Sequence, residues 1–469
     1  MNMTRTHIGD LKEKIGQEVM ICGWVDVRRD HGKLIFIDLR DASGKVQMVA
    51  LPNHAEAHTA TSAVRSEWVL EVTGKVNERP SRMINVDEPN GTVEIEILGI
   101  KVLNEANTPP FDVRSDGKEI GEESRLTHRY LDLRRPRMQK NIRNRSKATK
   151  FIRDEFTKRG FVEIETPLLS ATTPEGSRDY VVPSRLDKGK FYSLPQSPQQ
   201  YKQLLMVAGF EKYFQIARCM RDEDTRGDRQ PEFTQLDMEM SFVAREEVMQ
   251  VNEEILINLV QTLYPEKKIQ EIPFPRISYK EAMEKYGVDK PDLRKDKEDP
   301  NLLAFEWVID WPFFEKDEES GGWTFSHNPF SAPQPEHMTS LLAKKDIPNI
   351  LTTQYDIVMN GNEIGGGSIR NHQPEALKAV FQIMGYDDER IERNFGHMLE
   401  ALSAGAPPHG GIAWGFDRLM MLLENEPNIR EVIAFAKTGE GRDLMMHAPS
   451  ELDSKRLKEL GISLTKGKS

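Results

Sequence analysis

The chain has 469 residues, of which 38% are hydrophobic and 30% are charged, and its formal net charge is −11. This length exceeds one ordinary hydrophobic core, so we expect two or three domains of a soluble globular protein. The negative charge argues against a protein that coats nucleic acid by bulk phosphate attraction. It does not exclude a nucleic acid held by a local basic patch and by base stacking.

Cysteine content and hydropathy point to the cytoplasm. The two cysteines, Cys22 and Cys219, lie far apart in the sequence, which suits a reducing compartment and excludes a clustered cysteine metal site. No run of about 18 apolar residues occurs, and the first residues lack the apolar core of a secretory signal. We therefore expect a cytoplasmic protein without a membrane partner.

The N-terminal part is predicted to be a small β-barrel. Short β-type runs occupy residues 18–102 and are separated by Gly, Asn, Pro or Asp. Five strands in roughly one hundred residues predict a closed barrel at residues 1–104, and the five-stranded OB-fold is one way to close it. Pro109 and Pro110 then predict a linker or hinge over residues 105–136.

Residues 137–469 are predicted to form an α+β domain. Apolar residues at helical spacing indicate a helix over residues 139–159, which Gly160 would end. Long β runs and further helices follow without regular βα alternation. An antiparallel sheet flanked by helices is therefore favoured over a doubly wound fold.

The stretch 214–240 predicts two antiparallel strands joined by a charged loop. In the second strand Phe233 and Asp237 alternate with apolar neighbours, so an aromatic ring and a carboxylate share one face. Arg221 and Glu223 are expected to share a face of the first strand. Taken alone, the pattern also fits a solvated sheet face with a salt-bridged loop.

The segment "SLPQSPQQYKQLL" contains a helix start. Ser197 is placed to cap this helix, with Pro198 in the first turn and Gln200 completing a capping box. Gln199 and Lys202 would then share one face near the helix N-terminus, which favours a carboxylate ligand. An ordinary polar surface helix is the alternative.

Three consecutive glycines stand between a glutamate and an arginine in "GNEIGGGSIRNH", residues 361–372. Glycine weakens a strand, so the run implies a tight bulge, a close backbone neighbour or a ligand, with a surface hairpin as the alternative. Nearby, Asp356 and Glu363 could together hold Mg²⁺. Farther on, a Gly-rich strand enters a helix whose first turn carries Arg418, a poor place for a cation unless an anion binds there.

In this order the segments resemble the signature motifs of class II aminoacyl-tRNA synthetases, most closely the aspartyl-tRNA synthetase family of the bacterial type. The resemblance covers nearly the whole chain. It implies an OB barrel that reads the anticodon, a catalytic domain with an antiparallel sheet flanked by helices, and a homodimer with Pro167 of "EIETP" at its interface. The matching segments are "WVDVRRDHGKLIFIDLRD", "TPEGSRDYVVPSR", "SPQQYKQLLM", "RCMRDEDTRGDRQPEFTQLDMEMSFV", "YDIVMNGNEIGGGSIR" and "GIAWGFDRL".

The resemblance also implies a role for individual residues. The residues implied to bind ATP are Arg221, Asp222, Glu223, Gln230, Phe233, Glu363, Gly415, Phe416, Asp417 and Arg418. Those implied to bind aspartate are Glu175, Ser197, Gln199, Lys202, Arg221, Asp237, His327 and Arg370. Those implied to hold Mg²⁺ are Asp356 and Glu363. Those implied to read or discriminate tRNA are Arg29, His31, Phe36, Gln47 and Arg82.

The implied reaction joins aspartate to ATP as aspartyl adenylate, releases pyrophosphate, and then transfers aspartate to the 3′ end of tRNA-Asp. Arg221, Arg418 and Glu363 are the expected catalytic residues, acting on the phosphates and on Mg²⁺ without an enzyme nucleophile. A bidentate guanidinium at Arg370 would distinguish the carboxylate of aspartate from the amide of asparagine.

The chain departs from the family pattern at several places. Only ten residues separate "YGVDKPDLR" from "FEWVIDWP", where bacterial members usually carry an inserted domain. Asn328 stands where many relatives have a second histidine. His31 resembles the subtype that charges both tRNA-Asp and tRNA-Asn, whereas Arg82 departs from the glycine common in that subtype, so the choice of tRNA stays open.

Two other functions compete with this interpretation. A lysyl or asparaginyl relative would share the architecture but should lack the combination of Lys202, Asp237 and Arg370. A non-catalytic RNA-binding descendant of a synthetase is opposed by the intact Arg221 and Arg418.

Overall fold

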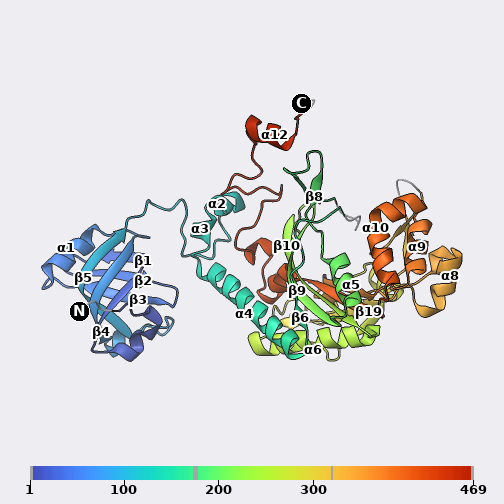
Figure 1. Cartoon of the computed structure of the whole chain (residues 1–469). Coiled ribbons are helices and arrows are strands. Elements are labelled where there is room, and N and C mark those ends of the chain that lie inside the picture. Colours follow the sequence, from blue (N-terminus) through green and yellow to red (C-terminus); the bar gives the residue numbers. More distant parts are fainter. Residues whose placement is uncertain (1–3, 173–177, 318–320, 466–469) are drawn as a thin grey trace. The chain divides into compact units, whose positions relative to one another are not determined.

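The computed structural model describes residues 4–172, 178–317 and 321–465 (Figure 1). The chain divides into two compact units, one formed by Met1–Ser124 and Tyr130–Pro136, the other by Arg125–Arg129 and Arg137–Ser469. The segment between the barrel and the second unit therefore contributes short stretches to both. It contains the helices α2 (Glu122–Thr127) and α3 (Arg129–Asp132).

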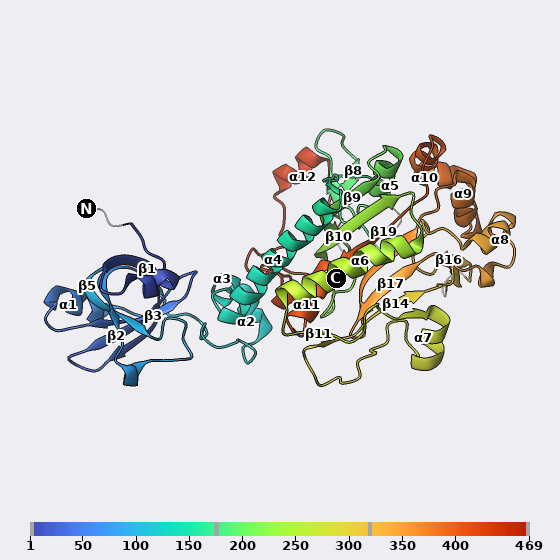
Figure 2. The same cartoon turned by 90° about the horizontal axis from the view of Figure 1, so that it is seen from below.

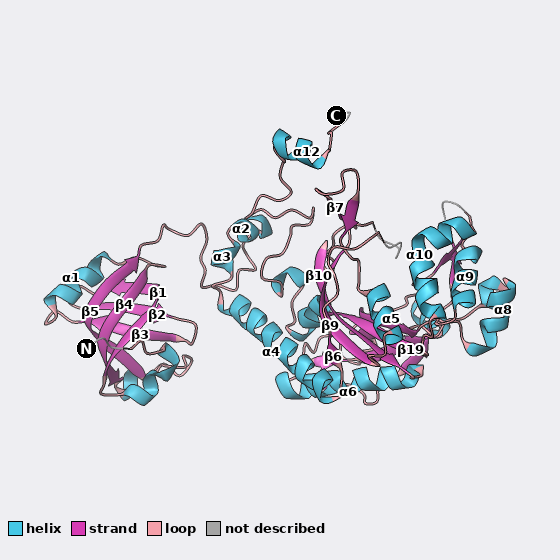
Figure 3. Cartoon of the chain, in the orientation of Figure 1, coloured by secondary structure: helices cyan, strands magenta, loops and turns pink. Residues whose placement is uncertain are grey.

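The first unit contains a closed barrel in the strand order β1-β2-β3-β5-β4 (Figure 3). Its elements are β1 (Glu18–Asp30), β2 (Ile35–Arg40), β3 (Lys45–Ala50), α1 (Ala55–Ala63), β4 (Val69–Glu78) and β5 (Val93–Asn104). Along β2, Ile35, Ile37 and Leu39 are buried in the barrel, whereas Phe36 and Asp38 alternate with them and are half-buried. This period-two pattern produces the predicted OB barrel, which is confirmed, and it places Phe36 outside the barrel core.

The second unit is built on a sheet of eight strands in the order β12-β14-β17-β18-β19-β10-β9-β6. From β14 to β9 all neighbours pair antiparallel, and only the edge strands β12 and β6 pair parallel. The predicted antiparallel sheet is thus confirmed, with two short parallel edges added. The strands are β6 (Val162–Glu163), β9 (Lys212–Met220), β10 (Glu232–Ser241), β12 (Arg276–Ser278), β14 (Phe305–Ile309), β17 (Tyr355–Met359), β18 (Asn362–Ile369) and β19 (His409–Gly415).

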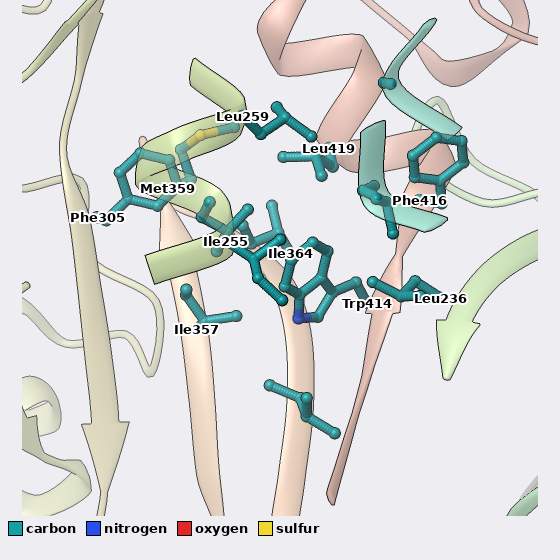
Figure 4. Packing of buried hydrophobic residues seen from close by; sticks show 14 of the residues in the cluster. Leu236, Ile255, Leu259, Phe305, Ile357, Met359, Ile364, Trp414, Phe416 and Leu419 are labelled. Carbon is teal, nitrogen blue, oxygen red and sulfur yellow. The ribbon is translucent and has the colours of Figure 1, made fainter. Parts of the chain in front are cut away.

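Three helices bury their apolar residues against one face of this sheet: α4 (Pro136–Lys158), α6 (Arg245–Leu263) and α11 (Phe416–Leu423). Helices α4 and α6 cross in front of the strands in Figure 2. In Figure 4, Leu259 of α6 and Leu419 of α11 lie above Trp414 of β19. Each fully buried side chain of this size contributes about 1.5–3 kcal/mol, so this layer fixes the sheet beneath the opposite, polar face.

The remaining elements surround the other face and the edges of the sheet. The further helices are α5 (Gln199–Val207), α7 (Tyr279–Tyr286), α8 (Met338–Ala343), α9 (Pro374–Ile383), α10 (Asp388–Ser403) and α12 (Ser454–Leu460). Short strand pairs are β7 (Val181–Pro183) with β8 (Phe191–Ser193), β11 (Lys268–Ile269) with β13 (Leu302–Leu303), and β15 (Phe314–Lys316) with β16 (Trp323–Phe325). Within the described residues, every helix is too short or too polar to cross a bilayer.

Two local predictions were wrong. Strand β9 ends at Met220, so Arg221 and Glu223 lie in the segment after the strand and not on its face. Helix α5 begins at Gln199 with Pro198 at the N-cap, one residue later than expected, and Ser197 Oγ accepts from the backbone N–H of Gln199 at 3.3 Å.

Candidate active site

A cavity of about 350 Å³ opens on the sheet face opposite the core. Along β10, Phe233, Gln235 and Asp237 line this cavity, whereas the alternating Leu236 and Met238 enter the core under the helices. The alternation predicted for this strand is therefore confirmed. It explains how one strand serves an apolar core and a polar site at once.

The cavity gathers most of the residues predicted to bind ATP or aspartate, although they come from distant parts of the sequence. Those that line it are Ser197, Gln199, Lys202, Arg221, Glu223, Gln230, Phe233, Asp237, His327, Glu363, Arg370, Gly415, Asp417 and Arg418.

Four predicted residues are not part of that lining. Phe416 is 1% exposed and packs in the core (Figure 4), and the side chain of Asp222 is not among those that line the cavity, although its neighbours Arg221 and Glu223 are. Asp356 is buried directly behind His327, whose Nε2 lies 2.9 Å from Asp356 Oδ2. Glu175 lies outside the described residues.

The floor of the cavity is a cluster of four buried charges. Lys202 Nζ lies 2.7 Å from Asp237 Oδ1 and 3.3 Å from Glu239 Oε2. Arg370 donates from Nε and Nη2 to the two carboxylate oxygens of Glu239, at 2.9 and 3.1 Å. All four residues are at most 2% exposed, so two cations and two anions compensate one another away from water.

The guanidinium of Arg370 is largely occupied by the protein itself. It also donates to Ser368 Oγ at 2.9 Å and to the backbone carbonyl of Gly411 at 3.1 Å. Four of its five N–H groups are thereby used. The bidentate pairing expected with a substrate carboxylate is made with Glu239 instead, which leaves one N–H of Arg370 for a ligand.

The two carboxylates of the cluster differ in their electrostatics. Burial raises the pKa of Asp237, and Lys202 opposes this only in part. Burial acts on Glu239 in the same direction, but Arg370 and Lys202 together outweigh it and lower the pKa of Glu239. Asp237 Oδ2 is buried without a hydrogen-bond partner among the described residues, so it offers a free acceptor at the cavity floor.

An aromatic ring and a cation stand side by side at another part of the cavity. The guanidinium carbon of Arg221 lies 5.2 Å from the ring centroid of Phe233. Arg221 Nε is buried and has no partner among the described residues. Gln230 Oε1 accepts a hydrogen bond from the backbone N–H of Lys437 at 2.7 Å, which fixes that side chain at the rim. A flat base and a phosphate would find complementary groups here.

The start of α11 supplies a second cation. Arg418 Nη2 donates to Asp228 Oδ2 at 3.0 Å, and Nη1 donates to the backbone carbonyl of Glu363. The neighbouring Asp417 serves the fold, because its Oδ2 accepts from the backbone N–H of Thr234 at 2.7 Å. Arg418 is therefore held at the cavity wall by one carboxylate and one backbone carbonyl.

His327, Asp356 and Glu363 form a group whose ligand atoms all lie within 4.8 Å of one another. Although burial disfavours the imidazolium, Asp356 and Glu363 raise the pKa of His327 to about 9. The two carboxylates fit Mg²⁺, which prefers oxygen ligands, while the histidine already has Asp356 as its partner.

At each of the three consecutive glycines of β18, a larger side chain would collide with neighbouring atoms. A Cβ at Gly367 would lie 2.2 Å from the carbonyl oxygen of Gly411, and one at Gly365 would lie 3.0 Å from the carbonyl oxygen of Ala413. A Cβ at Gly366 would lie 2.9 Å from Asp356 Oδ1, on the cavity side. The run therefore allows close packing on β19 and leaves room at the carboxylate, which rules out the surface-hairpin alternative.

On the barrel, four of the five residues predicted to read tRNA lie on β1, β2, β3 and the turn between the first two strands. Arg29 donates to Gln47 Oε1 at 3.2 Å. The rings of His31 and Phe36 meet edge to face, with centroids 5.7 Å apart. Arg82 is exposed on a separate helical turn, Ser81–Met83. A half-buried Phe36 beside the exposed His31 and Arg29 offers aromatic and basic groups that suit single-stranded nucleic acid.

Sequence reasoning missed two residues of the site. Glu239 continues the odd-numbered face of β10, so the alternation that revealed Asp237 could have revealed it too. Gln354 lines the cavity and donates to Asp356 Oδ1 at 2.7 Å. No sequence pattern indicated Gln354, because its partners come from other segments of the chain.

Two family models match the chain. The model described as tRNA synthetases class II (D, K and N) matches residues 121–439. The model described as OB-fold nucleic acid binding domain matches residues 19–103. Together they account for both compact units.

Named relatives align with this chain over nearly the whole length of both proteins. A protein of Dehalococcoides mccartyi (strain CBDB1), named aspartate–tRNA(Asp/Asn) ligase, is 40% identical over 597 aligned positions, which cover 98% of this chain and 99% of the relative. A protein of Macrococcus caseolyticus, named aspartate–tRNA ligase, is 38% identical and covers 99% of each. Because these alignments are longer than the chain of 469 residues, the relatives carry sequence that this chain lacks.

Solved structures share the fold. A putative aspartyl-tRNA synthetase from Leishmania major Friedlin superposes with a TM-score of 0.75 at 20% identity, covering 93% of this chain and 94% of the other. An asparaginyl-tRNA synthetase from Pyrococcus horikoshii superposes with a TM-score of 0.74 at 22% identity, covering 93% and 98%. With the family model over most of the chain and full-length relatives near 40% identity, this chain belongs to the class II aminoacyl-tRNA synthetases, in the aspartate–tRNA ligase family.

Proposed function

We propose that this protein activates L-aspartate with ATP and transfers it to tRNA-Asp. The observation that carries this proposal is one cavity in which Lys202, Asp237 and Arg370 share a wall with Arg221 and Phe233. An amino-acid site and a nucleotide site thus open into the same space. Adenylate formation requires that proximity.

Aspartate fits the charged floor of the cavity. Its side-chain carboxylate would accept from the third N–H of Lys202 and the remaining N–H of Arg370, while its ammonium would donate to Asp237 Oδ2. Lys202 and Arg370 can only donate, so the amide NH₂ of asparagine would face donors and leave one hydrogen bond unmade. Glu239 sets this preference indirectly, because it orients both cations.

ATP fits the wall beside it. Adenine would stack on Phe233, and Arg221 would meet the α-phosphate, the centre that the substrate carboxylate attacks. Arg418 at the far wall would counter the terminal phosphates. Both arginines lie at the cavity before any ligand binds, so charge that develops on the phosphates would meet donors already in position.

Asp356 and Glu363 would hold Mg²⁺, which when bound neutralises phosphate charge. The space left by Gly366 supports this assignment, since a side chain there would collide with the carboxylate of Asp356. His327 would keep Asp356 oriented through their 2.9 Å contact and lie at the cavity surface near the amino acid.

The barrel would read the anticodon, with Phe36 stacking on a base beside Arg29 and Gln47. tRNA-Asn is a second candidate substrate, supported by the contact of His31 with Phe36 and by relatives named for both tRNAs. Aspartylation of unmodified tRNA-Asp and tRNA-Asn transcripts decides this point. Product on tRNA-Asp alone at high enzyme concentration would remove the second substrate.

We also propose a homodimer, because the family resemblance implies one and because apolar residues near Pro167 are exposed. Val162, Leu168 and Leu169, around Pro167, are 44%, 45% and 52% exposed. Their burial by a second copy would explain them. As a translation enzyme the protein would act in the cytoplasm.

Amino-acid-dependent exchange of pyrophosphate into ATP tests the proposed reaction. We expect exchange with aspartate, and none above background with asparagine or lysine at the same concentration. Exchange with asparagine or lysine instead would assign the chain to another branch of its class. A folded protein that exchanges with none of them would indicate a non-catalytic descendant.

A further inference from the structure

A line of buried polar side chains connects the cation at the cavity floor with the carboxylate proposed to hold magnesium. Arg370 Nη1 donates to Ser368 Oγ at 2.9 Å. The hydroxyls of Ser368 and Ser331 lie 2.9 Å apart, and Ser331 Oγ lies 3.3 Å from Gln354 Oε1. Gln354 Nε2 donates to Asp356 Oδ1 at 2.7 Å.

The hydroxyl of Ser331 is the shared link of this line. Ser368 Oγ accepts from Arg370 Nη1 and from Ser331 Oγ, one hydrogen bond at each of its two lone pairs. Ser331 has a single hydroxyl hydrogen, which lies within hydrogen-bonding distance of both Ser368 Oγ and the amide oxygen of Gln354. The NH₂ of Gln354 faces Asp356. Connected hydrogen bonds in a buried network polarise one another.

The line is isolated from solvent and joins separate segments. Gln354 is 1% exposed, Ser331 is 1% exposed and Ser368 is fully buried. Ser331 belongs to the stretch before α8, Gln354 directly precedes β17, and Ser368 is on β18. A break in a buried line leaves polar groups unsatisfied on both sides, so its members are constrained together.

Asn328 supports the same amide from a further side. Its Nδ2 lies 3.4 Å from Gln354 Oε1, and its Oδ1 accepts from the backbone N–H of Phe330 at 3.0 Å. The orientation of Gln354 is thereby fixed, with its oxygen toward Ser331 and its nitrogen toward Asp356.

We propose that Gln354 is a positioning residue that, through Ser331 and Ser368, keeps the guanidinium of Arg370 in the position that binds aspartate. This inference rests on the proposed function, because it concerns the affinity of that same pocket. Gln354 acts through Arg370, and both of its polar atoms are already engaged within the protein. Loss of a link lets Ser368 Oγ move away from Nη1, the nitrogen that carries the N–H of Arg370 left for a ligand.

Calorimetric titration of the whole protein with L-aspartate, without ATP or metal, tests the proposal. Gln354→Met removes both amide contacts at similar volume, and Ser331→Ala removes one oxygen. We expect each to weaken aspartate binding about tenfold, the effect of a buried hydrogen bond to a charged network. Because both substitutions break the same line, the double variant should also bind aspartate about tenfold more weakly, and not a hundredfold.

The controls separate this proposal from a loss of folding and from the proposed function. Gln382→Met changes a partly exposed glutamine that donates to Asp388 Oδ1, away from the cavity, and this variant should bind aspartate as the unmodified protein does. In pyrophosphate exchange, the KM for aspartate should rise in the Gln354 and Ser331 variants while the KM for ATP stays. If Gln354→Met fails to fold, Ser331→Ala and Ser368→Ala form the same cycle.

Two results would overturn the proposal. One is unchanged aspartate affinity in variants whose unfolding midpoint matches that of the unmodified protein. The other is a double variant in which the losses of aspartate-binding free energy of the two single variants add. If the unmodified protein itself does not bind aspartate, the failure lies with the proposed function and not with Gln354.

Discussion

Glu306 of β14 carries a carboxyl group that the folded protein should keep protonated at neutral pH. It is fully buried, and neither carboxylate oxygen has a hydrogen-bond partner among the described residues. Burial, helped by the charge of Asp292, raises the pKa of Glu306 to about 9. The perturbation we consider is Glu306→Gln, which keeps the shape and removes the titration.

The sign follows from proton counting. Between its ordinary pKa of 4.5 and about 9, Glu306 holds a proton in the folded state that the unfolded chain releases, so stability falls as pH rises through this window. One pKa unit corresponds to about 1.4 kcal/mol, so at pH 7.5 the group costs about 4 kcal/mol relative to acid conditions. Glu306→Gln should escape this cost.

Urea denaturation at pH 6, 7 and 8, followed by intrinsic tryptophan fluorescence, measures the difference in the free energy of unfolding. We expect the stability of Glu306→Gln relative to the unmodified protein to increase by about 1.4 kcal/mol per pH unit. The slope does not depend on any fixed cost of burying the new amide. Glu284→Gln, at an exposed position of α7, is the matched control and should show no slope. If the free energy of unfolding of Glu306→Gln changed with pH in parallel with that of the unmodified protein, the reasoning would be refuted.

Two substitutions test the cavity, and a third tests the barrel. Gly366→Ala places a Cβ 2.9 Å from Asp356 Oδ1, so magnesium-dependent exchange should fall at least about tenfold with an unchanged urea midpoint; normal exchange would contradict the steric account. Phe233→Leu should raise the KM for ATP about tenfold and spare the KM for aspartate, because base stacking contributes about 1–3 kcal/mol; equal effects on both would argue against adenine at that ring. His31→Ala should reduce aspartylation of tRNA-Asn more than that of tRNA-Asp, and an equal reduction would remove His31 from discrimination.

Much of the fold could be predicted because local patterns and tertiary structure agree. Alternation along β10 predicted which residues face a core, and the helical spacing before Gly160 predicted α4, whose end has Gly160 at φ +80°. The steric need for the glycines at 365–367 was also predictable in kind, since such a run requires close neighbours.

The rest depends on contacts between distant segments. Both carboxylate oxygens of Glu239 accept hydrogen bonds from the guanidinium of Arg370, 131 residues away in the sequence. Nothing local in either segment indicates that pairing. Gln354 acquires its role only when Ser331 and Asp356 meet it in the folded chain. The start of α5 was misplaced because Pro198 can occupy either the cap or the first turn, and sequence alone does not choose between them.

The most direct test of the central claim is a crystal structure of the protein with a non-hydrolysable analogue of aspartyl adenylate. We predict that the ammonium of the analogue donates to Asp237 Oδ2, that its side-chain carboxylate accepts from Lys202 and Arg370, and that adenine stacks on Phe233. An analogue bound with its side chain away from Lys202 and Arg370, or with its base away from Phe233, would contradict the account.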